Sequence, residues 1–168
     1  RLLLRGEENV VEALSANDTV QYWNPSSEVC ISIIDMMVDP ENHCYLWLLC
    51  PSVTHDANGD QTYNPAYSTN LGMINLGDQN LGSNTLSKTI PLTWFDTNKI
   101  IPTSFAMKSD NDEVDADIFI VANTDDGGGV VYKVEDIYDQ QQDFYQIPGD
   151  FGTLIFGAEI FLDQLIVG

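Results

Sequence analysis

Short apolar runs, repeatedly interrupted by turn residues, constrain the fold of this chain more than any other feature. The runs are rich in β-branched and aromatic residues and are bounded by Gly, Pro, Asn and Asp, as in 45–50 (YLWLLC) and 118–122 (IFIVA). Runs of this length and composition are typical of β-strands. Helix signals are nearly absent, and the best helix candidate is the segment 7–16. The sequence therefore predicts an all-β chain.

The predicted strands recur in the same order along the chain. A strand, a turn and a strongly apolar strand occur at 30–50, 101–124 and 152–168, and a further strand follows the first two, at 71–76 and 129–136. A four-stranded antiparallel unit repeated with unequal loops predicts the blades of a β-propeller, whereas a β-sandwich has no reason to repeat this order.

About two and a half blades fit, and a propeller closes a ring of four to eight blades. We therefore expect a fragment of one larger six-bladed domain. Its predicted parts are an N-terminal segment with the outer strand of a preceding blade (1–29), a blade (30–92), a second blade (93–148) and the start of a further blade (149–168).

Three cysteines leave one thiol free or paired outside the chain. Cys44 and Cys50 are disfavoured as a pair, because six residues of one extended strand span roughly 20 Å. If 39–43 (DPENH) is a hairpin turn, residues whose numbers sum to about 81 or 82 face each other, and Cys30 then lies close to Cys50. We therefore predict a Cys30–Cys50 disulfide. Together with the glycosylation sequon at Asn17, it favours an extracellular protein.

Three stretches carry a resemblance to a known family: 36–52 (MMVDPENHCYLWLLCPS), 116–136 (ADIFIVANTDDGGGVVYKVED) and 151–161 (FGTLIFGAEIF). They are similar to the repeats of the major royal jelly and yellow protein family, which are secreted six-bladed propellers. The resemblance covers 30–168. It implies non-catalytic binding of a small ligand, such as a biogenic amine or another aromatic or lipid-like compound. The alternatives are a structural extracellular module that assembles with other copies, and a yellow-like enzyme that converts dopachrome.

Two pairs of residues are predicted to bind the ligand. Propeller ligands bind on loops near the central channel, which favours Asn123 and Thr124, just past the strand that ends at 122. Tyr22 and Trp23 lie in a segment that resembles the loop before a blade. Trp94 is a further aromatic candidate for a ligand pocket, whereas an apolar strand around Trp47 predicts a core position for that residue.

Two acidic segments are candidates for calcium, and no other cofactor is predicted. Asp56, Asn58 and Asp60 stand at alternate positions, as in a calcium loop, but the residues at the sixth and twelfth positions do not fit. The alternative there is a simple turn at Asn58. In the loop at 110–117 the spacing of the aspartates is also irregular, and a solvated hairpin loop is favoured. The three glycines at 127–129 predict a tight turn.

The charge of the chain limits its partners. It has 26 acidic and six basic residues, a net charge of −20 and a pI near 4.1. This balance repels nucleic acid and anionic membrane surfaces, and it suits a cationic ligand or serves solubility alone. The apolar residues at 2–4 are too few for a membrane span. We therefore expect a secreted protein with a small-molecule ligand or other copies as partners, without nucleic acid and without a membrane span.

Overall fold

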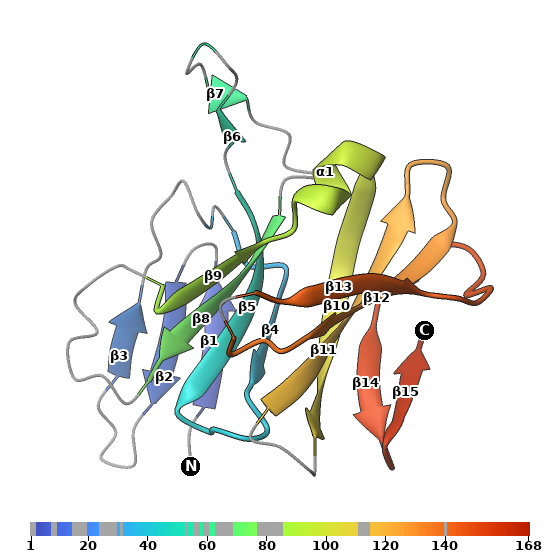
Figure 1. Ribbon diagram of the computed structural model, residues 1–168. Coiled ribbons are helices and arrows are strands. Elements are labelled where there is room, and N and C mark those ends of the chain that lie inside the picture. Colours follow the sequence, from blue (N-terminus) through green and yellow to red (C-terminus); the bar gives the residue numbers. More distant parts are fainter. Residues whose placement is uncertain are drawn as a thin grey trace.

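The chain is built almost entirely of antiparallel β-sheets (Figure 1). The computed structural model describes residues 3–7, 10–14, 20–23, 30, 32–52, 54–55, 58, 61–62, 69–76, 86–110, 115–139 and 141–168. The strands are β1 (Leu3–Glu7), β2 (Val10–Leu14), β3 (Val20–Trp23), β4 (Asp35–Val38), β5 (Tyr45–Pro51), β6 (Thr54–His55), β7 (Gln61–Thr62), β8 (Thr69–Asn75), β9 (Lys88–Pro91), β10 (Ile100–Asp110), β11 (Asp115–Thr124), β12 (Gly129–Glu135), β13 (Asp143–Ile147), β14 (Ala158–Phe161) and β15 (Gln164–Val167). One short helix, α1 (Thr93–Asn98), is found among the described residues. The prediction of an all-β chain is confirmed.

Two four-stranded sheets form the centre of the structure. Their strand orders are β4-β5-β8-β9 and β10-β11-β12-β13, so neighbours in each sheet follow one another along the chain, apart from the small β6–β7 hairpin. The ranges 30–92 and 93–148 each hold one of these sheets. A two-stranded sheet of β14 and β15 follows, as Figure 1 shows.

The N-terminal strands form a separate three-stranded sheet in the order β1-β2-β3. The best helix candidate, 7–16, is not a helix, because Val10–Leu14 is a strand that pairs with both neighbours. The adjacent β-branched residues Val10 and Val11 favour an extended backbone. The segment also has too few apolar residues to form the apolar face of an amphipathic helix.

The hairpin of β4 and β5 is confirmed, but its predicted register is wrong. Asp35 faces Leu49, so the numbers of facing residues sum to 84 instead of 81 or 82. The turn is longer than predicted because the carboxylate of Asp39 organises it. Its Oδ1 accepts hydrogen bonds from the backbone N–H groups of Glu41 and Asn42, at 2.9 and 3.1 Å. Aspartate often stabilises turns by such bonds to the backbone of nearby residues.

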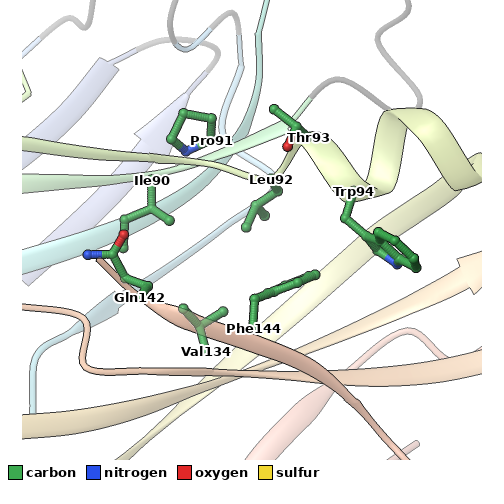
Figure 2. Close-up of a pocket in the computed structure, with 8 residues that line it drawn as sticks. All are labelled: Ile90, Pro91, Leu92, Thr93, Trp94, Val134, Gln142 and Phe144. Atoms are coloured by element: carbon green, nitrogen blue, oxygen red, sulfur yellow. The ribbon is translucent and has the colours of Figure 1, made fainter. Parts of the chain in front are cut away.

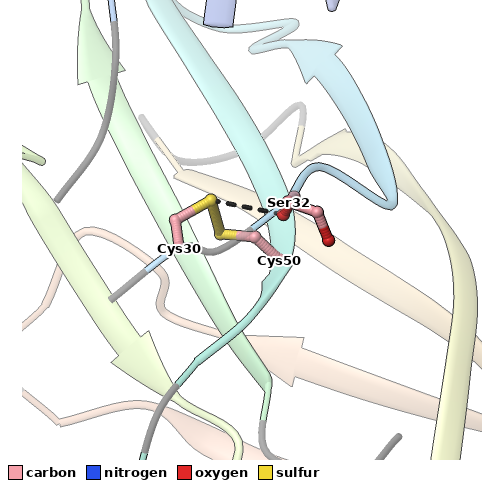
Figure 3. The surroundings of a disulfide bond; sticks show 3 residues. All are labelled: Cys30, Ser32 and Cys50. Atoms are coloured by element: carbon pink, nitrogen blue, oxygen red, sulfur yellow. Dashed lines mark hydrogen bonds between the residues drawn. A yellow bond between two sulfur atoms is a disulfide. The ribbon is translucent and has the colours of Figure 1, made fainter. Parts of the chain in front are cut away.

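The disulfide prediction is confirmed despite the register error (Figure 3). Cys30 and Cys50 are bonded, with their Cα atoms 5.2 Å apart, and both are fully buried. The bond joins the segment before β4 to the end of β5. The third cysteine, Cys44, is exposed and free.

Successive sheets pack against each other, and the core lies between them. Because neighbouring residues of a strand point to opposite faces, β5 contributes Trp47 and Leu49 to the core that it shares with Phe105 and Ile118 of the second sheet. Leu46 belongs to a second cluster on the opposite face of the first sheet. The far face of the second sheet packs in turn on the segment that leads into β14 and β15.

The first strands of the three successive sheets are neighbours. β10 contacts β4 on one side and β14 on the other. The carboxylate of Asp35 in β4 accepts hydrogen bonds from the Ser104 hydroxyl at 2.5 Å and from the Phe105 N–H at 3.1 Å. β10 is an edge strand with a bulge between Pro102 and Ser104, and an edge strand or bulge is where a sheet tolerates proline.

Candidate functional site

A pocket of about 200 Å³ lies where the two four-stranded sheets meet (Figure 2). One wall comes from β9 and the start of α1, and the other comes from β12, β13 and the loop before β13. Its lining residues are Ile90, Pro91, Leu92, Thr93, Trp94, Val134, Gln142 and Phe144, and we call this site the seam pocket. Figure 2 shows Gln142 at one end and Trp94 at the other.

The floor and the rim of the seam pocket differ in exposure. Ile90, Leu92 and Val134 are buried and form an aliphatic floor. Trp94 is 50% exposed and lies at the rim. The pocket thus combines an apolar interior with an aromatic entrance, which is typical of sites for small organic molecules.

Four aromatic side chains meet beside the pocket. The rings of Tyr132 and Phe144 are stacked with a centroid distance of 5.1 Å, and Phe95 meets Tyr132 edge-on. The indole Nε1 of Trp94 donates a hydrogen bond to the Tyr132 hydroxyl at 3.2 Å. Aromatic pairs in such geometries contribute about 0.5–1.5 kcal/mol each beyond the burial of their area. The cluster therefore holds Trp94 in place although half of its surface is exposed.

The loop that carries Gln142 is tied to the first sheet. Tyr138 donates a hydrogen bond to the Asp39 carboxylate, and this carboxylate also accepts a hydrogen bond from the Trp47 indole at 2.8 Å. Lys88 Nζ donates to the carbonyl oxygen of residue 139 at 2.5 Å, and Gln142 Nε2 donates to the same oxygen at 2.5 Å. The position of Gln142 therefore depends on bonds between the two sheets.

Asn123 and Thr124, both predicted to bind ligand, lie together at the end of β11. Asn123 is 5% exposed, and its side-chain amide donates to the carbonyl oxygen of Ile155 and accepts from the N–H of the same residue, both at 2.8 Å. The Thr124 hydroxyl accepts a hydrogen bond from the Gly128 N–H at 2.9 Å. These bonds fix the segment before β14 and the turn between β11 and β12, which confirms the predicted glycine turn. Ligand binding by this pair stays a prediction.

The other predicted pair belongs to a different sheet. Tyr22 and Trp23 lie in β3, where they face Glu12 and Val11 of β2. They are therefore strand residues, and their expected place in a loop is wrong. For these two residues the structure describes the backbone alone. A role in ligand binding stays a prediction for them too.

The candidate calcium segments lie partly outside the described residues. Asn58 is exposed in the turn between β6 and β7, and Asp56 and Asp60 are not among the described residues. The turn at Asn58 is confirmed, because His55 pairs with Gln61 on its two sides.

The acidic loop at 110–117 connects β10 and β11, as the hairpin interpretation predicts, and Asp110 faces Asp115 at its base. Asp112 lies outside the described residues. Within the described ranges, no three acidic, histidine or cysteine side chains are grouped as metal ligands would be. Calcium binding stays a prediction for both segments.

One lysine is surrounded by acidic groups on the second sheet. Lys133 lies 2.8 Å from the Asp117 carboxylate and also bonds to Glu135. Partial burial alone lowers the pKa of a lysine, but these hydrogen bonds outweigh it and hold the Lys133 pKa above its ordinary value. The bond from Lys133 lowers the pKa of Glu135, and the Tyr145 hydroxyl donates to Glu135 at 2.8 Å, which raises the pKa of Tyr145.

Most of the seam pocket was not predicted from the sequence. Trp94 was an aromatic candidate, but the residues around 90 and those around 142 carry no motif that links them. They meet because β9 and the start of α1 face β12, β13 and the loop before β13 across the pocket. Trp47, in contrast, is a core residue, as predicted.

Comparison with known proteins identifies no relative of this chain. No family model matches the chain, and no curated protein or solved structure is significantly similar to it. Among the described residues, no helix has the length and apolar character that crossing a membrane requires.

Proposed function

We propose that this chain is part of a secreted six-bladed β-propeller that binds a small aromatic ligand without transforming it. The observation that carries the proposal is the seam pocket, with its aliphatic floor and its aromatic rim at Trp94. A net charge of −20 favours the approach of a cationic ligand, such as a biogenic amine.

The arrangement of the sheets supports the propeller part of the proposal. Blades of a propeller are four-stranded antiparallel sheets arranged radially, with the first strand of each blade next to the central axis. The two four-stranded sheets follow chain order, pack face to face, and bring β4, β10 and β14 next to one another. The same features agree with the proposed relationship to the royal jelly and yellow proteins.

The disulfide supports secretion, because such bonds persist in oxidising compartments and are rare in the cytosol. Cys30 and Cys50 are fully buried, so their bond is part of the packed first sheet.

Equilibrium dialysis against dopamine and serotonin tests the binding part of the proposal. We expect saturable binding, and mass spectrometry should recover the ligands unchanged relative to a protein-free blank. Trp94→Phe should weaken binding. Trp47 is no suitable control, because it is fully buried in the core and bonds to Asp39. The exposed Phe156 offers the matched control Phe156→Leu, which should bind as the parent does. Failure to retain either amine would overturn the proposal, and protein-dependent loss of dopachrome absorbance would favour the enzyme alternative.

A second candidate function is assembly with other copies through β14 and β15. Phe161 is 59% exposed and Ile166 is 52% exposed on one face of this hairpin, and β15 pairs only with β14 among the described residues. An unpaired apolar edge strand is prone to pair with another chain. Sedimentation velocity should then show assemblies that Phe161→Ser with Ile166→Thr dissolves; a monomer at all concentrations would exclude this candidate.

A further inference from the structure

The eight described side chains that line the seam pocket carry no ionisable group. This contrasts with the charge of the whole chain, in which acidic residues outnumber basic ones by 26 to six. An ammonium group that entered the pocket would lose its hydration without meeting a carboxylate, and desolvation of an unpaired charge is costly.

Cation–π contacts do not compensate for this loss at the floor of the pocket. Such contacts need an aromatic face within about 6 Å of the cation. The buried floor consists of Ile90, Leu92 and Val134, and Trp94 lies at the rim. Phe144, the other aromatic lining residue, already stacks one of its faces on Tyr132, with a centroid distance of 5.1 Å. The interior therefore suits the uncharged ring of a ligand, and an ammonium group is better accommodated outside, in water.

Two lining side chains, Thr93 and Gln142, offer polar groups to a ligand, and the Gln142 amide lies at the end of the pocket opposite Trp94. The Gln142 amide nitrogen donates to the carbonyl oxygen of Asp139 at 2.5 Å, which orients the amide. Within the described part of the chain, no group donates to the remaining Gln142 Oε1 of this amide, which Figure 2 shows at its end of the pocket. A carbonyl oxygen only accepts hydrogen bonds, so the matching group on a ligand is a donor.

The volume limits the size of the ligand. A dry apolar cavity of about 150 Å³ is known to hold one benzene molecule, and the seam pocket offers about 200 Å³. One ring with a short substituent fills this space.

From these observations we propose that the seam pocket takes a neutral planar ring bearing one hydrogen-bond donor, of the phenol or indole type, whose donor bonds to Gln142 Oε1. An ammonium group on such a molecule stays in solvent and adds little to affinity. This inference rests on the proposed function, since it names the class of ligand that the same pocket binds.

Three ligands that share a benzene ring with a two-carbon chain separate the contributions: 4-ethylphenol, tyramine and ethylbenzene. Tyramine adds an ammonium group to 4-ethylphenol, and ethylbenzene lacks its hydroxyl. Binding to the whole chain is measured by tryptophan fluorescence, excited at wavelengths where phenols do not absorb, and by saturation-transfer NMR of the ligands. We expect 4-ethylphenol to bind about fivefold more tightly than ethylbenzene, as one neutral hydrogen bond allows. Tyramine should bind within about twofold of 4-ethylphenol at physiological and at high salt, where screening removes distant charges.

Two variants test the hydrogen bond. Gln142→Leu should remove the preference for 4-ethylphenol over ethylbenzene, and the exposed residue Gln146 in β13 offers the matched control Gln146→Leu, which should keep the preference. Circular dichroism confirms that both variants are folded.

The possible failures are distinguishable. If none of the three ligands binds, the pocket is no ligand site and the proposed function fails with the inference. If tyramine binds and 4-ethylphenol does not, aromatic-amine binding stands and the neutral-ring inference is wrong. If ethylbenzene binds as tightly as 4-ethylphenol, the role of Gln142 is refuted.

Discussion

Asp39→Ala tests whether a single buried carboxylate joins the two four-stranded sheets. Its Oδ2 accepts hydrogen bonds from the Trp47 indole at 2.8 Å and from the Tyr138 hydroxyl. Asp39 and Trp47 are fully buried. The carboxylate is thus the shared acceptor of one donor from the first sheet and one from the loop between β12 and β13.

The cost of the substitution follows from the hydrogen bonds to the carboxylate that it removes. An unsatisfied buried donor costs about 1–3 kcal/mol, and a hydrogen bond to a charged acceptor is worth about 1.5–3 kcal/mol. The fully buried Trp47 indole loses its acceptor, and the half-buried Tyr138 hydroxyl loses a bond to a charged acceptor, while the two backbone N–H groups of the turn can bond to water instead. We therefore expect Asp39→Ala to lower the free energy of unfolding by about 3–5 kcal/mol.

Urea unfolding, followed by tryptophan fluorescence and circular dichroism, measures this loss. With a slope of about 2 kcal/mol per molar urea, the midpoint should fall by about 2 M. Asp96→Ala is the matched control, because Asp96 is exposed on α1 and surface substitutions change stability by at most about 0.5 kcal/mol. Equal midpoints for the two variants would refute the bridging role of Asp39.

Three further predictions concern the disulfide, the hydrogen bond between Tyr145 and Glu135, and the hydrogen bonds between Asn123 and Ile155. Replacing Cys30 and Cys50 together by serine should cost about 3 kcal/mol of unfolding free energy, since the bond closes a loop with a sequence separation of 20, and urea unfolding checks this. Glu135→Gln should lower the pKa of Tyr145, measured by NMR of ring-labelled tyrosine, because the carboxylate that raises it is gone. The folded-state pKa of Tyr145 is raised, so its bond stabilises the fold fully below the unfolded pKa of about 10 and is lost as pH rises through the folded pKa; the variant should lose less stability in this alkaline range. Asn123→Ala removes two buried hydrogen bonds, so it should cost about 2 kcal/mol and increase amide exchange in the segment before β14.

Each of these predictions has a control of the same chemistry. Cys44→Ser alters the exposed free thiol and should leave stability unchanged, Glu159→Gln should not move the Tyr145 pKa, and Asn98→Ala should not affect exchange before β14. A disulfide variant as stable as Cys44→Ser would contradict the first prediction. An unchanged Tyr145 pKa in Glu135→Gln, or unchanged exchange in Asn123→Ala, would contradict the other two.

The sequence by itself determined the class of secondary structure and the local pairings. Apolar runs such as that of β5 predicted strands, and the three glycines after Thr124 predicted the turn to β12, because strand propensity and turn chemistry depend on neighbouring residues. The same local logic paired Cys30 with Cys50. The sequence did not give the correct register of β4 and β5. The register depends on the hydrogen bonds that the Asp39 side chain makes within the turn, and a count of turn residues does not reveal these bonds.

Only the tertiary structure decided where the candidate site lies. Ile90 and Gln142 are separated by about fifty residues, and they share a pocket because the edges of two sheets meet. It also decided that the amide of Asn123 bonds to the backbone of Ile155, which no spacing in the sequence encodes. The contact between two sheets depends on how the side chains of both sheets fit together. Local patterns therefore specified the strands of this protein, and the contact between sheets specified its pocket.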